Sequence, residues 1–353
     1  MVLSTYLLGV SCYATGEGYS TIPMPGFFSP TALRYKNALD SENGKVWIGM
    51  RDLGILVWDN STWSNWDPNN GCPSVNVTAI DLLATGEAWV GCDTGGVGYY
   101  DGFAWNTFAN WNSPIPFSRI NCIKKIGNDV WAGSNAGLLK YNNSMWTIYN
   151  AATSALPSDT INDIISDGNG GIYLATEQGL IRFNNNVWSE FWGNNSTDVI
   201  DDVHLNTNGQ LFALSGGLLY TNTNSQWANA GQSNGFDFPG HPFGGAKSIT
   251  NNSQGDVLVN AKESKLYQHT GNKTSVYYLP RLYCLSNFAL SILDTDEITG
   301  EIWFVNSIVT NAQQADLYKL DLTNYLGLGK GLTPDNLKYL DANETQACIA
   351  NRG

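Results

Sequence analysis

A short motif with an aromatic residue and a small one recurs at a fixed interval along the chain. The segments VWIG from Val46, AWVG from Ala88, VWAG from Val130 and IYLA from Ile172 lie 42 residues apart. The aromatic position of this motif continues at longer intervals, in the series Trp47, Trp89, Trp131, Tyr173, Phe212, Leu258 and Trp303. A fixed period of this size indicates a repeat fold in which each unit is one supersecondary element. The sequence therefore predicts seven units.

Each unit contains four short apolar segments. An apolar segment such as VTAI from Val77 precedes the aromatic, and a Gly follows the aromatic and opens another segment, as in GLLKYN from Gly137. A Trp then recurs 15 or 16 residues beyond the aromatic of its unit, at Trp63, Trp105, Trp146, Trp188 and Trp227. Four strands in about 42 residues is the pattern of a propeller blade. We therefore predict an all-β fold, a seven-bladed β-propeller of four-stranded blades.

The two ends of the chain complete the prediction. The last unit, with EIWFVN from Glu301 and DLYKLDL from Asp316, lacks a fourth strand, and GYSTIPM from Gly18 has the pattern of an outer strand. We expect this N-terminal outer strand to close the ring, because closure removes an unpaired sheet edge. The propeller is then expected to span residues 18–325. Residues 1–17 resemble the end of a secretory signal, and residues 326–353 are expected to be a linker or the start of a truncated following domain.

Charge and hydropathy exclude several classes of partner. The chain has 18 Lys and Arg against 31 Asp and Glu, a net charge of -13, which argues against binding to nucleic acid or to an anionic membrane surface. No apolar run reaches the length of a membrane-spanning helix, so membrane insertion is not expected. We expect a monomeric propeller within a longer protein, in the periplasm, outside the cell or on its surface. Cys72 and Cys92 are interpreted either as a disulfide or as buried thiols.

Motifs of catalysis and metal binding are missing from the sequence. The three histidines, His204, His241 and His269, have no second His or carboxylate at ligand spacing, and no nucleophile, zinc or phosphate-binding motif is present. The Asp- and Gly-containing segments DTDEITG and DGNGG lack a full calcium ligand series and are interpreted as hairpin turns. We therefore predict no catalytic residue, no metal site and no cofactor.

A ligand site is expected at the mouth of the central channel of the propeller, where the inner strands begin and the turns between second and third strands lie. Polar side chains there can hydrogen-bond sugar hydroxyls or a peptide, and exposed indoles can stack on a sugar ring. The alternative is that the Asp and Asn residues bond backbone amides in turns, and that the Trp residues cap the crevice between blades. The candidate ligand-binding residues are Arg51, Asp93, Trp111, Arg119, Asn121, Asn162, Asp163, Glu177, Trp192, Asp201 and Asp202.

The repeat unit resembles the two-component regulator propeller repeat. The segments that carry this resemblance are VTAIDLLATGEAWVGCDTGGVGYYD, INCIKKIGNDVWAGSNAGLLKYN and INDIISDGNGGIYLATEQGLIRFN. The motif pattern fits residues 33–224 well and residues 249–322 loosely. The resemblance implies a periplasmic sensor propeller, which in that family belongs to hybrid histidine kinases that sense oligosaccharides. This chain differs in having one propeller, with no immunoglobulin-like domain, membrane span or kinase.

From these observations we predict a non-catalytic, extracytoplasmic propeller that recognises a glycan or protein ligand. The first alternative is a polysaccharide or small-molecule lyase or hydrolase, in which two of the acids Asp163, Asp201 and Asp202 form a carboxylate pair. The second alternative is a structural or adhesive surface propeller.

Overall fold

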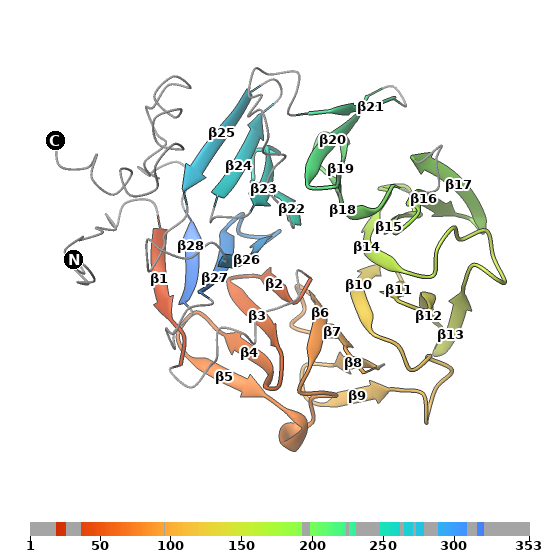
Figure 1. Cartoon of the computed structure of the whole chain (residues 1–353). Helices are drawn as coiled ribbons and strands as arrows, with labels where there is room; N and C mark the ends of the chain where they lie inside the picture. Colours follow the sequence, from red (N-terminus) through yellow and green to blue (C-terminus); the bar gives the residue numbers. More distant parts are fainter. Residues whose placement is uncertain are drawn as a thin grey trace.

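The described strands form seven antiparallel sheets of four strands each, arranged as blades around one axis (Figure 1). This arrangement is seen in a computed structural model that describes residues 19–25, 37–94, 96–192, 198–223, 226–230, 248–261, 265–270, 273–278, 289–308 and 316–320. The predicted signal remnant at residues 1–17, the linker at 326–353 and His241 lie outside these residues. The prediction of an all-β, seven-bladed propeller is confirmed.

Blades 1 to 4 follow one another along the chain, and each runs from its innermost to its outermost strand. Blade 1 is β2 (Leu39–Glu42), β3 (Lys45–Met50), β4 (Gly54–Trp58) and β5 (Trp63–Trp66); blade 2 is β6 (Val77–Leu82), β7 (Ala88–Cys92), β8 (Val97–Tyr100) and β9 (Trp105–Phe108); blade 3 is β10 (Ile120–Ile126), β11 (Asp129–Ser134), β12 (Gly137–Asn142) and β13 (Met145–Tyr149); blade 4 is β14 (Ile161–Ser166), β15 (Ile172–Thr176), β16 (Gly179–Asn184) and β17 (Val187–Trp192). A 3-10 turn, Pro68–Asn70, follows β5.

The remaining blades have the same order. Blade 5 is β18 (Ile200–Leu205), β19 (Leu211–Ser215), β20 (Leu218–Thr223) and β21 (Gln226–Asn229); blade 6 is β22 (Ser248–Asn251), β23 (Val257–Ala261), β24 (Lys265–Thr270) and β25 (Lys273–Tyr278); blade 7 is β26 (Ala289–Thr295), β27 (Ile302–Ile308), β28 (Asp316–Leu320) and, as its outermost strand, β1 (Tyr19–Pro23). The strand β1 pairs antiparallel with β28, from Tyr19 opposite Leu320 to Pro23 opposite Asp316. The predicted closure by an N-terminal strand is therefore confirmed.

The glycine of the repeated motif is required by the contact between blades. In blades 1 to 3 this residue is Gly49, Gly91 or Gly133, and a Cβ there would overlap the first residue of the next inner strand. At Gly133, for example, the added carbon would lie 2.6 Å from Ile161 Cγ2. Inner strands of neighbouring blades therefore approach closely because the motif has no side chain at this position.

The repeated outer-strand Trp fills the space between blades. Trp105 lies 6.1 Å from Trp66 of the preceding blade, measured between ring centroids, and Trp188 lies 5.8 Å from Tyr149. Trp192 belongs to the same series as Trp66 and Tyr149, because a register shift in blade 4 places it opposite Leu180. The sequence analysis named Trp192 as a candidate ligand-binding residue, with a Trp that caps the crevice between blades as the alternative. Its place in this series favours the alternative. Its ring stacks on Trp227 of blade 5 at 4.8 Å.

Among the described residues, three blades also contain a cation on the face of the motif aromatic. Lys140 lies opposite Trp131 in the strand register, with its Nζ 4.8 Å from the ring centroid and 2.8 Å from Asp129. The equivalent groups are Arg182 over Tyr173 with Asp167, and Lys319 over Trp303 with Glu301. In each group the cation and the aromatic lie on adjacent strands, and the cation also forms an ion pair.

Candidate functional site

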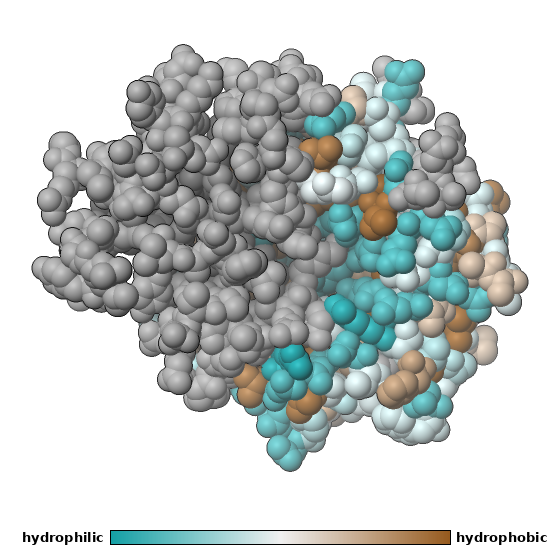
Figure 2. All heavy atoms as spheres, in the orientation of Figure 1, coloured by the Kyte–Doolittle hydropathy of each residue, from teal (hydrophilic) through white to brown (hydrophobic). Residues whose placement is uncertain are grey.

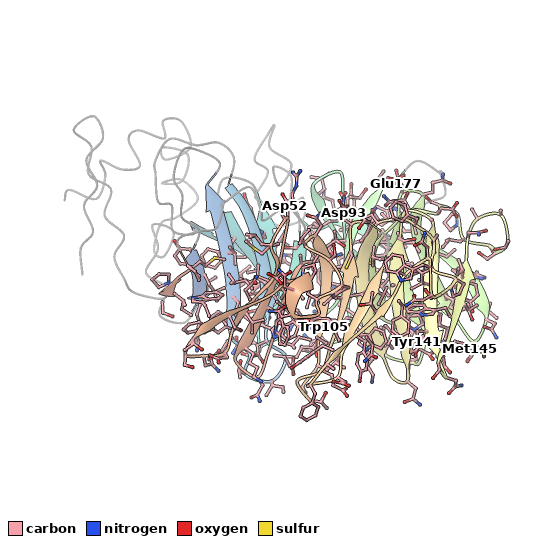
Figure 3. The ribbon with its side chains drawn as sticks, turned by 90° about the horizontal axis from the view of Figure 1, so that it is seen from below. Asp52, Asp93, Trp105, Tyr141, Met145 and Glu177 are labelled. Atoms are coloured by element: carbon pink, nitrogen blue, oxygen red, sulfur yellow. The ribbon has the colours of Figure 1, made fainter. Side chains whose placement is uncertain are left out.

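The turns between second and third strands and the connections into the inner strands form one face of the propeller, which we call the top face. Figure 3 shows Asp52, Asp93 and Glu177 along the upper edge and Met145 near the opposite edge. Backbone hydrogen bonds tie the two kinds of loop together, as from Glu177 N to Thr160 O at 3.3 Å. Seen from the top face, the described surface is mostly hydrophilic, with scattered hydrophobic patches (Figure 2).

The connection from β9 to β10 holds an exposed indole in a fixed loop. The side chain of Ile115 is buried beneath this connection, and the backbone N–H of Ser113 donates to Ala109 O at 2.8 Å. The Asn112 side chain accepts from Ala109 N and donates to Thr107 O, which closes the loop on itself. Trp111, at the tip, is 76% exposed, and Phe117 in the same connection is 69% exposed. Because the loop is anchored, it holds the indole in solvent at a fixed position.

The charged candidates of the top face form ion pairs. Arg119 Nε lies 3.6 Å from Asp93 Oδ1, and Arg51 Nε lies 3.4 Å from Asp52 Oδ2. These side chains are all more than a third exposed, so the pairs contribute little stability and exchange readily with water or with a polar ligand. Glu177 is also exposed.

The polar residues at the start of the inner strands have a different role, because they hold neighbouring blades together. Blades 2 to 5 each contain a β-bulge at this position, where one residue stands outside the strand register. The bulge residue donates to the first carbonyl of the next inner strand: Thr78 Oγ1 to Ile120 O at 2.5 Å, Asn121 Nδ2 to Ile161 O at 2.9 Å, and Asn162 Nδ2 to Ile200 O at 2.9 Å. Asp201 occupies the bulge of blade 5.

Asn37, which the sequence analysis missed, lies at the same place in blade 1. Its Nδ2 donates to Asn121 O at 2.9 Å and to Asn162 O at 3.2 Å, and so connects blade 1 to blades 3 and 4. This amide therefore bridges the top end of the propeller axis. The sequence contains a signal for this equivalence, because Asn37 precedes the apolar pair Ala38 and Leu39 just as Asn121 precedes Cys122 and Ile123.

Two further candidates, Asp163 and Asp202, accept hydrogen bonds from backbone amides. The N–H of Val203 donates to Asp202 Oδ1 at 3.0 Å and to Asp163 Oδ2 at 3.3 Å, and the N–H of Ile249 donates to Asp202 Oδ2 at 2.9 Å. These bonds join blade 4 to blade 5 and blade 5 to blade 6. The sequence analysis gave, as the alternative to ligand binding, that these acids bond backbone amides in turns. The structure shows bonds to backbone amides, but most of them run between blades.

Deeper along the axis lies a second ring, polar at six of its seven positions, which we call the axial ring. Its members are the cross-strand partners of the motif aromatics on the inner strands: Asp40, Asp81, Lys124, Ile165, His204, Thr250 and Asp294. Three of the seven are acids and one is a Lys. The Lys124 ammonium lies 2.9 Å from Asp81 Oδ1, and Asp81 also accepts from Lys125 N of the next blade.

The enclosed position of the axial ring shifts the ionisation of several groups. Burial raises the pKa of the Asp294 carboxyl to about 6. Burial also holds the pKa of the Asp40 carboxyl well above its usual range, although the charge of Lys124 acts in the opposite direction. The charge of Asp81 raises the pKa of Lys124, and burial lowers the pKa of His204, which lies 2.7 Å from Asn251 Oδ1 through its Nε2.

Other expectations concern cysteines, metals and membranes. Cys72 and Cys92 are buried thiols that are not joined in a disulfide, and burial raises the pKa of the Cys72 thiol to about 11, so these thiols are poor nucleophiles. Within the described ranges, no cluster of His, Cys, Asp or Glu is suited to hold a metal ion. The same ranges contain no helix long and apolar enough to span a membrane.

Comparison of the whole chain with known proteins finds the fold in sensors and in an enzyme. No family model and no curated protein matches the chain. Among solved structures, the chain is similar to the extracellular domain of the putative hybrid two component system BT4673 from B. thetaiotaomicron, with 16% identity, a TM-score of 0.66, and coverage of 86% of this chain and 39% of that one. The corresponding domain of BT3049 from the same organism gives 17% identity, a TM-score of 0.65, and coverage of 87% and 41%.

A catalytically inactive virginiamycin B lyase from Staphylococcus aureus, in complex with quinupristin, is also similar. It has 14% identity and a TM-score of 0.65 over 87% of this chain and 99% of that one. The chain spans about two fifths of the length of the two sensor domains. The resemblance inferred from the repeat motifs is therefore confirmed for the fold: this propeller has the architecture found in the extracellular domains of two-component sensors.

Proposed function

We propose that the chain is a non-catalytic propeller that recognises a glycan or protein ligand outside the cytoplasm, in the periplasm or at the cell surface. The observation that carries this proposal is the anchored, 76% exposed Trp111 in the connection that also ends at Arg119, the partner of Asp93. An indole held in water by a rigid loop can stack on an apolar ligand face without a large loss of conformational entropy. The architecture shared with sensor extracellular domains supports the same proposal.

The ligand is expected on the top face and not inside the axis. Asn37 bridges the top end of the axis by bonding carbonyls of two other blades. Asn121 and Asn162 also bond carbonyls of the next blade. Trp111 and Glu177 are exposed, and Arg51, Asp93 and Arg119 are partly exposed. We therefore assign the contact with ligand to this exposed group.

The similarity to virginiamycin B lyase favours a second candidate, an enzyme that uses the acids at the start of the inner strands. The contacts of Asp163 and Asp202 weigh against it, because both carboxylates accept from backbone amides of the next blade. These bonds give both carboxylates a structural role in the contacts between blades.

A ligand screen that combines a glycan array with thermal shift tests the proposal, because a ligand that binds only the folded state raises the melting temperature. We expect Trp111→Ala to remove the shift of any hit. Phe103→Ala is the matched control, since Phe103 is 92% exposed at a turn between third and fourth strands, on the opposite face. Binding that survives Trp111→Ala, or turnover of a ligand that is lost in Asp202→Asn, would contradict the proposal.

A further inference from the structure

Closure of the ring brings two carboxylates together at the contact between blade 7 and blade 1, which we call the closing seam. The backbone N–H of Ser41 donates to Asp294 Oδ2 at 2.8 Å and to Asp40 Oδ1 at 3.1 Å. The Ser41 hydroxyl donates to the same Asp294 oxygen. One amide thus serves an acid from each blade, so the two carboxylates lie within a few ångströms of each other.

The charged groups around this pair of carboxylates carry a net negative charge. The acids are Glu42 on β2, Asp81 on β6, and Asp296 and Glu297 after β26, while the single cation among these groups is Lys124 on β10. Further round the axis, the inner strands β14 and β18 contribute Asp163 and His204, and the described residues of β22 contribute no charged group. Because Lys124 already pairs with Asp81 at 2.9 Å, it neutralises the seam only in part.

The ionisation of these acids follows from that environment. Burial raises the pKa of both Asp294 and Asp40, and burial together with Asp296 and Glu297 raises the pKa of Glu42 to about 7. Two interacting carboxyls lose their protons in two steps that belong to the pair, and the second step occurs at a higher pH than the first.

We propose that Asp40 and Asp294 together retain a proton near neutral pH, and that the closing seam is a proton-binding site whose occupation strengthens the contact between the first and last blades. With the proton present, one of the two carboxyls is neutral, and the repulsion between like charges is removed. When the proton leaves, two carboxylates face each other across the seam and repel.

The sign of the pH effect follows. An unfolded Asp titrates near pH 4, and the folded pair titrates higher, so folding takes up protons between these two values. The stabilisation is fully present below about pH 4, and it is lost as the pH rises through the folded-state pKa of Asp294, which is about 6. The ring is thus held more firmly in a mildly acidic medium.

Thermal unfolding of the full chain between pH 5 and pH 8 tests this proposal. Asp294→Asn keeps an oxygen for Ser41 and removes the charge; we expect it to melt higher than the wild type at pH 8 and to show a flatter pH dependence. Asp40→Asn, which keeps an acceptor for Leu82 N at 2.6 Å, should behave in the same way.

Asp296→Asn is the matched control at the same seam. Burial tends to raise the pKa of Asp296, but hydrogen bonds from Gly44 N at 2.6 Å and from Thr299 and Ile298 outweigh it, so its pKa lies below the usual value. This variant should therefore melt lower than the wild type at both pH 5 and pH 8. The proposal is overturned if neither Asp294→Asn nor Asp40→Asn melts above the wild type at pH 8, or if their melting temperatures fall in parallel with the wild type.

Discussion

Replacement of Gly133 by Ala tests the explanation for the repeated motif. Gly133 lies in β11 at the contact between blades 3 and 4, and a Cβ there would lie 2.5 Å from Cys122 Sγ and 2.6 Å from Ile161 Cγ2. Both neighbours are buried, and Ile161 has no exposed surface, so neither can move aside without displacing an inner strand. The expected consequence of the substitution is a wider contact between these two blades.

The size of the effect follows from two opposing contributions. Overpacking a close contact costs about 1–3 kcal/mol, and replacing a strand Gly by Ala returns about 0.5–1 kcal/mol of chain entropy. Because both neighbours would lie closer than 3 Å, the packing cost falls in the upper part of its range, about 2–3 kcal/mol. We therefore expect Gly133→Ala to lower the free energy of unfolding by about 1–2.5 kcal/mol. Equilibrium urea unfolding measures this as a lower midpoint at an unchanged slope.

Two further variants separate the packing effect from other causes. Removing the Ile161 side chain beyond Cβ relieves part of the overlap, so the cost of Gly133→Ala should be smaller in an Ile161→Ala background. Blade 4 has Ala175 at the equivalent position, where an Ala is tolerated, so Ala175→Gly should destabilise by about 1 kcal/mol through the lost methyl group. The reasoning is refuted if Gly133→Ala is as stable as the wild type, or if its cost and that of Ile161→Ala simply add.

Three further outcomes are expected. Asn162→Ala removes the bond to Ile200 O and should cost about 1 kcal/mol in urea unfolding, whereas Asn110→Ala, at an exposed loop position, should cost nothing measurable. Burial tends to raise the pKa of Asp167, but hydrogen bonds from Asn169 N, Arg182 and Gly171 N outweigh burial and lower that pKa. Asp167→Asn should therefore lower the free energy of unfolding at pH 7. The difference from the wild type should vanish as the pH falls below the folded-state pKa of Asp167. Trp111→Ala should change the free energy of unfolding by less than about 0.5 kcal/mol, and a larger loss would show that the indole serves packing and not recognition.

The sequence predicts the blades well because each strand has its own marker. The motif aromatic marks the second strand, the Gly after it opens the third, and a Trp marks the fourth. Trp192 shows where this fails: Phe191 has the expected spacing from Trp188, but the register shift opposite Leu180 brings Trp192 into the packing position. The shifted residue stacks on Trp227 of the next blade, and the pattern of one strand does not contain that contact.

The candidate site was predictable only in part, for a similar reason. Exposed residues such as Trp111 stand out because they break the repeat, and the structure finds that side chain in solvent. Asp40 and Asp294 were not among the candidates, and Asp294 was interpreted only as part of the DTDEITG turn. The two acids lie seven and nine residues before their motif aromatics, Trp47 and Trp303, and only the strand register shows that they are equivalent. Their proximity across the closing seam depends on ring closure, which joins opposite ends of the chain.

The pairing of β1 with β28 has a consequence for how the chain reaches its native state. Synthesis produces Tyr19–Pro23 first, but its partner Asp316–Leu320 follows almost three hundred residues later. Until then the first strand has no sheet to join, and blades 1 to 6, whose strands are contiguous, can form ahead of it. The last blade is therefore expected to assemble as a late, long-range step. A nascent or truncated chain without either end is left with an open ring and an exposed strand edge, the form most prone to aggregate.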